Sequence, residues 1–396
     1  MDISGLKIVF WSGLLLVFYA YLCYGMLLWC WLKLSRRRRP KPEQTGETWP
    51  EVSFVVCAYN EEDVIREKIK NSLSVDYPPE KITFYFVTDG STDATADIVR
   101  RYPFPAGCRW KHLHATVRSG KIAAFQRAMQ EINSPVIIST DANTTVNPEA
   151  VKRLAAHFSD SKIGAVAGEK RVAMPVQSAA SSAGEGIYWR YESMLKKMDA
   201  EFGSVLGAAG ELFAFRLEAY EHVPSDTLVE DFYLTMRMAQ KGWRVQYEPG
   251  AFAVESASAS VSEEIKRKVR IAAGGLQAVV RLAALLNVFR YGKLSFQYIS
   301  HRVLRWTLAP LLLPVILVTN VGLACNAEPW YKWLLAIQVI FYLFALLGWF
   351  LESRSVKVKA FFIPYYFCMM NWAMYAGFVR LVRGKQTVLW EKATRI

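Results

Sequence analysis

The 396-residue chain has little cysteine and histidine, the side chains on which disulfide frameworks and zinc sites depend. Its five histidines are scattered, and its six cysteines form no Cys-x-x-Cys pair and have no histidine nearby at ligand spacing. Three of the cysteines lie in apolar spans and one in an expected core strand. We therefore expect reduced, structural thiols and no zinc site.

A nucleic-acid-binding motif is also missing, although the net charge is +13. The basic clusters at residues 36–39 and 380–385 flank apolar spans, which favours anionic lipids of the cytoplasmic leaflet as partners and argues against nucleic acid. The N-terminus lacks the basic region and small-residue cleavage site of a signal peptide. A nucleic-acid-binding or secreted protein is thus not indicated.

The chain does contain long apolar stretches, with 13 Trp, 19 Tyr and 22 Phe. Residues 8–32 carry no charge and are long enough to cross a bilayer, and the four arginines that follow place the next segment in the cytoplasm. Three further spans are expected at residues 306–324, 333–351 and 361–381, the first kinked or broken by Pro310 and Pro314. We predict a multi-pass protein of the cell membrane.

The topology of the C-terminus has two solutions. Several Lys and Arg lie in residues 290–305, 352–359 and 380–396, and three simple crossings cannot place all of them inside. Three crossings put the basic tail outside, whereas a re-entrant or interfacial segment puts it inside. We favour the inside tail.

The middle of the chain has the texture of a cytosolic α/β domain. Strands are expected at residues 52–58, 82–87, 110–115 and 136–141, and they alternate with helical stretches, which predicts a doubly wound, mostly parallel sheet. The expected organisation is a transmembrane helix (1–35), a basic, Pro-containing linker (36–50), the α/β domain (51–260), amphipathic interfacial helices (261–300), a transmembrane region (301–382) and a basic tail (383–396).

Polar residues follow three of these strands, and parallel strands bring such ends to one edge, where ligands bind. Asp141 and Asn143 end the fourth strand with oxygen ligands that suit Mg²⁺ or Mn²⁺ carrying a phosphate, although a plain Asx-turn explains these two residues equally well. Asp89 precedes a Gly-Ser turn, and Lys121 follows Gly120, which permits close backbone approach to a phosphate.

Ordinary structural roles remain open for each polar residue. Asn60 could cap the helix that follows it, and Asp89 could serve the next helix in the same way. Lys121 could be a solvated surface lysine. The pair Glu230 and Asp231 could stabilise the N-terminus of a helix over residues 232–238 through the helix dipole.

Taken together, the motifs and their order resemble the inverting family 2 glycosyltransferases, in the membrane-embedded branch of cellulose, hyaluronan and poly-N-acetylglucosamine synthases. The resemblance covers about residues 50–290 and implies a GT-A fold. The motifs that carry it are Cys57-Ala58-Tyr59-Asn60-Glu61-Glu62, Thr88-Asp89-Gly90-Ser91-Thr92-Asp93, Ser119-Gly120-Lys121, Thr140-Asp141-Ala142-Asn143 and Glu230-Asp231.

The resemblance also implies roles for single residues. Asp231 would be the general base, and Asp141 with Asn143 would hold the metal. Gly210, Glu211 and Glu230 would lie on the acceptor side. The nucleotide-sugar would be bound by Tyr59, Asn60, Glu61, Asp89, Lys121, Asp141 and Arg270.

The chain departs from the family in two places. The second acidic residue of the Asp-x-Asp metal motif is the amide Asn143, which supplies an oxygen but no charge. The Gln-x-x-Arg-Trp motif of processive members keeps only Arg270, with Ile271 in place of the tryptophan that stacks on the acceptor sugar.

We therefore expect an inverting, metal-dependent transfer from a UDP-sugar to a growing polysaccharide at the cytoplasmic face, by a homo-oligomer or with an export partner. Transfer of a single sugar to a membrane lipid, and a non-catalytic membrane subunit, are the alternatives.

Overall fold

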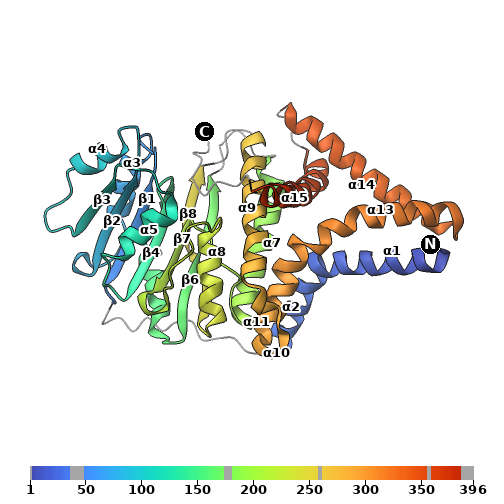
Figure 1. The fold of residues 1–396 in the computed structure, drawn as a ribbon, viewed down its shortest axis with the longest axis horizontal. Helices are drawn as coiled ribbons and strands as arrows, with labels where there is room; N and C mark the ends of the chain where they lie inside the picture. The colour runs from blue at the N-terminus through green and yellow to red at the C-terminus, as the bar shows by residue number, and fades with distance from the viewer. Residues whose placement is uncertain (1, 36–48, 174–180, 257–260, 355–357, 385–396) are drawn as a thin grey trace. The chain divides into compact units, whose positions relative to one another are not determined.

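The computed structural model describes residues 2–35, 49–173, 181–256, 261–354 and 358–384 (Figure 1). Its contacts divide the chain into two compact units. The helical unit contains Met1–Arg36, Met174–Met198 and Ser260–Gln386, and the sheet unit contains Arg37–Ala173, Asp199–Ala259 and Thr387–Ile396. Each unit is described by itself.

Within the described residues, the sheet unit has one eight-stranded sheet in the order β3-β2-β1-β4-β7-β6-β8-β5. The neighbours from β3 to β4 are all parallel, as are β6 and β8, whereas the pairs that involve β7 or β5 are antiparallel. The mostly parallel sheet is therefore confirmed. The strands are β1 Val52–Ala58, β2 Ile82–Asp89, β3 Trp110–Ala115, β4 Val136–Asp141, β5 Thr144–Val146, β6 Ile163–Ala173, β7 Leu212–Arg216 and β8 Arg244–Ser256.

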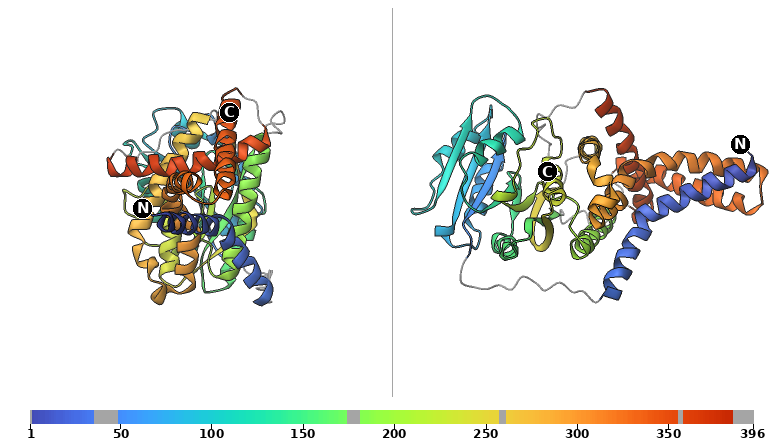
Figure 2. Two further views of the ribbon diagram at one scale, coloured as in Figure 1. Left: turned by 90° about the vertical axis from the view of Figure 1, so that its right-hand side faces the viewer. Right: turned by 60° about the horizontal axis from the view of Figure 1, so that its bottom comes forward.

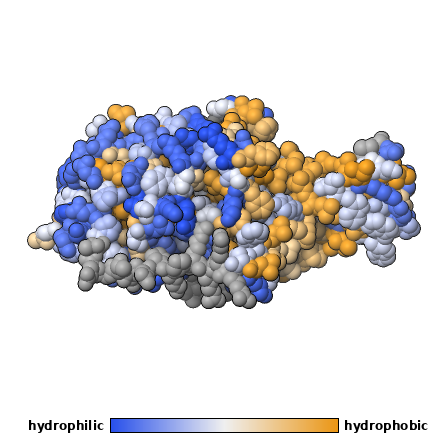
Figure 3. Space-filling view, turned by 90° about the horizontal axis from the view of Figure 1, so that it is seen from below, coloured by the Kyte–Doolittle hydropathy of each residue, from blue (hydrophilic) through white to orange (hydrophobic). Residues whose placement is uncertain are grey.

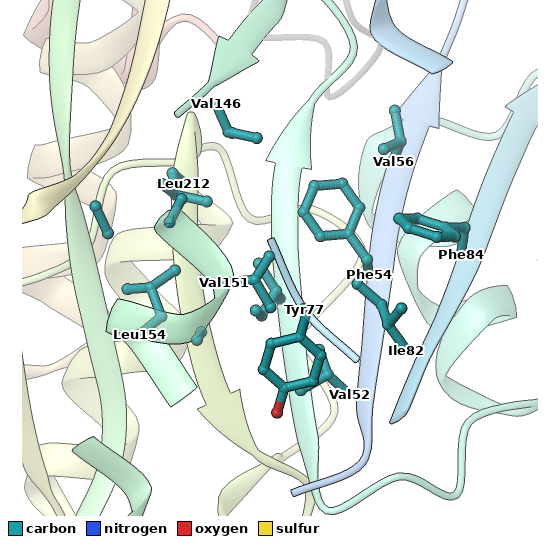
Figure 4. Close-up of a cluster of buried hydrophobic side chains, with 14 of the residues drawn as sticks. Val52, Phe54, Val56, Tyr77, Ile82, Phe84, Val146, Val151, Leu154 and Leu212 are labelled. Carbon is teal, nitrogen blue, oxygen red and sulfur yellow. The ribbon is translucent and has the colours of Figure 1, made fainter. Parts of the chain in front are cut away.

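Helices cover both faces of this sheet. Alternate residues of β1 pack with α3, α4 and α6 in a large apolar cluster, part of which is drawn in Figure 4. Helix α5 contacts β1 and β2 but contributes nothing to that cluster, so it covers the other face. The helical elements are α3 Ile65–Leu73, α4 Thr95–Arg101, α5 Lys121–Met129, α6 Ala150–Ala156, α8 Glu230–Gln240 and the 3₁₀ turns Pro79–Lys81, His157–Ser159 and Leu217–Ala219.

The helical unit begins with α1 Ile3–Phe18, a π-helical turn η1 Tyr19–Cys23 and α2 Tyr24–Ser35. A second π-helical turn, η6 Tyr298–Val303, contacts the first, and the Tyr19 and Ser300 hydroxyls are 2.8 Å apart. The other elements are α7 Ser181–Phe202, which ends in the sheet unit, α9 Val261–Arg281, η5 Ala283–Leu286, α10 Val288–Tyr291, α11 Lys293–Gln297, α12 Leu304–Trp306, α13 Leu308–Asn326, α14 Trp330–Ser353 and α15 Lys359–Val382.

Three helical stretches among the described residues are long and apolar enough to span a membrane: Ile3–Ser35, Leu308–Asn326 and Trp330–Glu352. Helix α1 lies beside the hairpin of α13 and α14 (Figure 2), and Phe10 packs there with Ile316 and Tyr331. Apolar side chains gather on the surface of this unit (Figure 3). At the end of the hairpin, Lys7 and Glu328 form an ion pair of 2.6 Å.

Two details differ from the predicted spans. The third C-terminal span falls on α15, which is not among the three stretches and instead packs along α9. Helix α13 runs unbroken through Pro310 and Pro314. Pro310 lies near the first turn, where a backbone N–H has no acceptor within the helix, so its missing N–H costs no hydrogen bond. The residues after Pro314 also remain helical. The break comes before it, at Thr307, where φ is −121° and ψ is −76°.

Candidate functional site

The site forms where β4 ends. Strand β1 lies between β2 and β4 and pairs with both in parallel register, with Cys57 opposite Asp141. The residues of β4 are buried up to Thr140, and Asp141 is the first to reach partial exposure. Burial raises the pKa of the Cys57 thiol to about 12, so Cys57 is an inert neighbour of the site.

Lys121 joins the metal motif to the Glu230-Asp231 motif. Its Nζ lies 2.8 Å from Oδ1 of Asp141 and 2.8 Å from Oε1 of Glu230. The three side chains are 20–22% exposed, which excludes the solvated surface lysine as an interpretation of Lys121 and leaves the cluster accessible to a ligand. Burial opposes the charge of Lys121, but the Asp141 and Glu230 carboxylates outweigh it and hold the pKa of Lys121 well above its usual range.

Asp231 lies in the first turn of α8, beside this cluster. A Cβ atom on Gly210 would be 3.1 Å from Nζ of Lys121 and 3.4 Å from Oδ2 of Asp231, so the backbone of Gly210 closely approaches both. Burial and the Glu230 carboxylate raise the pKa of Asp231 to about 7, and Lys121 limits the rise. A carboxylate with that pKa is suited to accept a proton near neutral pH.

Asp89 holds the loop that carries Lys121. Its carboxylate is 1% exposed and accepts hydrogen bonds from the backbone N–H of Ser119 at 2.9 Å and of Gly120 at 2.7 Å. Arg127 approaches the other oxygen at 3.3 Å. Asp89 therefore positions Lys121 through the loop, and its predicted contact with the nucleotide stays a prediction.

Asn60 is the one described non-glycine residue with positive φ, at 52°. Its side-chain oxygen accepts from the backbone N–H of Thr92 at 2.8 Å, and its amide donates to the Thr92 hydroxyl at 3.2 Å. It therefore ties the end of β1 to the turn after β2 and does not cap α3. The guanidinium of Arg118 stacks 3.9 Å from the Tyr59 ring, and Glu61 is buried beside α4, where its N–H donates to Thr95.

Glu211 belongs to a buried network under the site. Its carboxylate pairs with Lys170 on β6, which also pairs with Glu255 on β8. The carbonyl of Glu211 accepts from the hydroxyl of Thr140 at 2.8 Å. Glu211, which directly precedes β7, thus links this strand to β6 and β4. Its contact with an acceptor remains a prediction.

Arg270 lies on α9 in the helical unit, so its role in nucleotide binding also stays a prediction. It is exposed, whereas its neighbours Lys266 and Arg267 pair with Glu263 and Glu264 within the helix. Ile271, at the place of the missing tryptophan, is 37% exposed.

The donor set at β4 fits a divalent ion that shares its ligands with a diphosphate. No group of three or more His, Cys, Asp or Glu residues in the described part of the chain could hold a metal by itself. Asp141 and Asn143 could provide the one or two protein oxygens that such an ion needs when phosphate and water complete its shell. Asp141, Glu230 and Asp231 outnumber Lys121, and this excess negative charge favours a cation.

No role was predicted from sequence for Lys68, Arg118, Thr140 or Thr144, although Thr140 belongs to one of the motifs. Lys68 had a detectable signal, because it shares the apolar face of α3 with Ile65 and Ile69 at i, i+3 and i+4 spacing. Arg118 had none, since its stacking partner Tyr59 is distant in the chain.

Comparisons with known proteins agree with this geometry. The family model described as glycosyltransferase like family 2 matches residues 50–274. The poly-beta-1,6-N-acetyl-D-glucosamine synthases of Staphylococcus epidermidis and Staphylococcus aureus are each 25% identical to this chain, over 237 and 248 residues. These matches cover 58% and 61% of this chain and only 56% and 58% of the relatives.

Among solved structures, the mannosyltransferase PcManGT from Pyrobaculum calidifontis, in complex with GDP-Man and Mn²⁺, has a similar fold with a TM-score of 0.73 and 21% identity. The alignment covers 96% of this chain and 100% of that one. The chain belongs to glycosyltransferase like family 2, and its sheet unit is a GT-A glycosyltransferase domain with associated apolar helices.

Proposed function

We propose that the chain transfers a sugar from a nucleotide-sugar to an acceptor hydroxyl with inversion at the anomeric carbon. The observation that carries the proposal is the bridge formed by Lys121 between Asp141 and Glu230. It brings together the side of the site that would hold a diphosphate and the helix start that carries Asp231. If Glu230 and Asp231 only stabilised the helix N-terminus and Asp141 only formed an Asx-turn, no ion pair between the two motifs would be expected.

In the proposed reaction, Asp231 accepts the proton of the acceptor hydroxyl while that oxygen attacks the anomeric carbon. The bond from this carbon to the diphosphate oxygen breaks, and the nucleoside diphosphate leaves with the electron pair. Lys121 favours departure by placing a positive charge near the developing negative charge. Because Gly210 has no side chain, a sugar could approach the Asp231 carboxylate there without meeting a Cβ atom.

Asp141 and Asn143 would hold the divalent ion, Mg²⁺ or Mn²⁺, which when bound would neutralise the diphosphate. The crystal complex of PcManGT with GDP-Man and Mn²⁺ supports this choice of ion class. By the family resemblance the donor is a UDP-sugar, and the PcManGT complex makes GDP-sugars the first alternative.

The synthase relatives support a growing polysaccharide as the acceptor. A single transfer to a membrane lipid is the second candidate, and one observation favours it: α9 presents Ile271 where processive members have tryptophan. If the acceptor is a polysaccharide, we also expect a homo-oligomer or an export partner.

The helical unit supports a location of the sheet unit on the cytoplasmic side. The Lys7–Glu328 pair places the start of α1 at the same end as the turn between α13 and α14. If Ile3–Ser35, α13 and α14 each cross once, that end is outside and every basic segment, at 36–39, 290–305, 352–359 and 380–385, is inside. Helix α15 then lies on the inner side, which removes the conflict over the tail.

The topology can be tested at Cys325, an exposed thiol in the last turn of α13. A membrane-impermeant maleimide should label it in intact cells, and Cys325→Ser should abolish that label. Labelling of Cys325 only after permeabilisation would reverse the proposed orientation.

The reaction can be tested with a panel of radiolabelled UDP- and GDP-sugars in Mn²⁺, followed by sizing of the product. Long polymer indicates the synthase, and a lipid with one sugar indicates the second candidate. Asp231→Asn should lower turnover by about 10²–10⁴-fold, the range for a lost general base. Asp97→Asn, an exposed carboxylate of α4, serves as the matched control.

Unchanged turnover in Asp231→Asn would remove Asp231 as the base. No transfer from any donor by the unmodified protein would favour the non-catalytic membrane subunit.

A further inference from the structure

Lys68 is a buried lysine that the proposed reaction does not use. It lies on α3 and is 1% exposed, with Ile65 and Ile69 of the same helix face in the apolar core. A charged side chain is rarely placed so deep without a specific partner, because removal of an ammonium from water is costly. The contacts of its Nζ atom therefore indicate what the residue does.

Among the described residues, the hydrogen bonds of Nζ go to the two strands that flank the metal motif. Nζ donates to Oγ1 of Thr140 at 2.9 Å, to the carbonyl of Thr144 at 2.8 Å and to Oγ1 of Thr144 at 3.3 Å. An ammonium has three N–H donors, and three acceptors surround this one. Thr140 is in β4 and Thr144 begins β5, so Lys68 connects the two arms of the Asp141-Ala142-Asn143 turn.

The two hydroxyl groups extend this connection to the site itself. Oγ1 of Thr144 donates to the carbonyl of Asp141 at 2.9 Å, and Oγ1 of Thr140 donates to the carbonyl of Glu211 at 2.8 Å. Each hydroxyl accepts from Lys68 and gives its own proton to a backbone carbonyl. One carbonyl is in the metal motif, and the other follows Gly210, whose backbone approaches Lys121 and Asp231.

We propose that Lys68 is a positioning residue of the donor site, which holds Thr140 and Thr144 together and thereby fixes the Asp141-Ala142-Asn143 turn in the geometry that binds the metal and diphosphate. This inference rests on the proposed function, because it assigns the turn to donor binding. It explains why a lysine is buried here: an apolar side chain of the same length supplies none of the three donors.

A purely structural role makes a different prediction. Loss of core stability lowers the amount of folded protein and leaves the Michaelis constants of the remaining folded enzyme unchanged. Loss of the turn geometry raises the KM for the donor and the metal concentration for half-maximal activity, and it changes kcat much less. Ile69→Ala is the matched control, because Ile69 is the next residue of α3, is fully buried and belongs to the apolar core.

The experiment compares Lys68→Met, Lys68→Arg and Ile69→Ala as detergent-solubilised full chains. In Lys68→Met, the donor KM and the Mn²⁺ requirement should rise about 10-fold, as is typical when a residue that orients a metal ligand is lost. Lys68→Arg keeps donors and charge and should recover part of the effect. Hydrogen exchange at the amides of Ala142 and Asn143 should accelerate in Lys68→Met and stay unchanged in Ile69→Ala.

Thr144→Val provides a second variant if Lys68→Met does not fold, and it should change the same constants in the same direction. Calorimetric binding of UDP or GDP with Mn²⁺ separates the two hypotheses. If the unmodified protein and Lys68→Met bind equally well, or Ile69→Ala raises the constants as much, the role of Lys68 is wrong and the proposed function stands. If the unmodified protein neither binds nor transfers, both are wrong.

Discussion

Nζ of Lys121 lies 2.8 Å from Oδ1 of Asp141, and this ion pair joins the start of α5 to the end of β4. The same atom reaches Glu230 on α8. A single positive charge therefore offsets carboxylates from two motifs that are about ninety residues apart in the chain. The charge balance of the site depends on it.

Replacement of Lys121 by Met should lower kcat/KM at neutral pH by about 10²-fold, the usual cost of one lost electrostatic contact to a developing charge. Because Lys121 lowers the pKa of Asp231, the variant should also need a higher pH for activity. Full pH–rate profiles of Lys121→Met and Lys121→Arg test this, since arginine keeps the charge. An acid limb that does not move in Lys121→Met would contradict the assigned coupling.

The unmodified enzyme should lose kcat/KM as the pH falls below about 7. Asp231 has a pKa of about 7 and must be ionised to accept a proton. The Glu230 carboxylate contributes to that raised pKa, so Glu230→Gln should move the acid limb to lower pH. A limb at the same pH in both proteins would show that Glu230 does not act on Asp231.

Asp231→Asn should stabilise the protein while it removes activity. The folded pKa of about 7 exceeds the ordinary value of 3.8, so the folded chain binds the proton more tightly than the unfolded chain. Ionisation therefore reduces the free energy of unfolding as the pH rises from about 4 to 7, and the loss is complete above pH 7.

Thermal unfolding in detergent checks this sign. The midpoint should be higher in Asp231→Asn than in the unmodified protein at pH 8, by about 2–4 °C for each kcal/mol gained, and nearly equal at pH 4. Asp97→Asn, at an exposed carboxylate outside the site, is the control variant for the same measurement. A lower midpoint for Asp231→Asn at pH 8 would mean that the carboxylate is stabilised in the fold.

Asn143→Asp should tighten metal binding, because it adds the carboxylate that the family motif has and this chain lacks. EDTA should abolish transfer by both proteins, and titration with Mn²⁺ or Mg²⁺ should restore it at a lower metal concentration in the variant, by about 10-fold for one added charge. Asn143→Ala provides the opposite change. Equal metal requirements in all three would remove Asn143 as a ligand.

Gly90→Ala should destabilise the sheet unit and weaken donor binding. Gly90 has φ of +63°, and a Cβ atom there would lie 2.3 Å from the backbone nitrogen of Arg118. The collision displaces the loop that Asp89 holds, at a cost of about 2 kcal/mol or more. Gly107→Ala is the control, because it has φ of +81° but open space, and should lose only about 1 kcal/mol.

The sequence predicted the parallel half of the sheet well because the information there is local. Residues 52–58 and 110–115 have the predicted bounds, and the first of these strands is an apolar run that ends at turn residues. Strands β5, β6, β7 and β8, which form the mixed half of the sheet, were not predicted as strands, because their pairing depends on contacts far apart in the chain. The sequence was sufficient to identify each motif residue, but it could not predict the distances between their side chains.

Charged residues in the core show the same limit. Lys68 on α3 and Lys170 on β6 are buried in networks whose partners come from other parts of the chain. A sequence pattern predicts on which face of a helix or strand such a residue lies. It does not predict which atom accepts its hydrogen bond. Asn60 is a similar case: a helix cap was the structural alternative to nucleotide binding, and its side-chain oxygen instead accepts a hydrogen bond from Thr92 in the neighbouring turn.

The π-helical turn η1 has a consequence for the first membrane helix. A π turn carries one residue more than an α turn, so the side chains after it are rotated by about 100° relative to those before it. Phe10 of α1 accordingly packs with the α13–α14 hairpin, whereas Gly25 of α2 lies against Tyr191 and Leu195 of α7. Deletion of a single residue in Tyr19–Cys23 would restore a uniform helix and turn one of these two faces towards lipid.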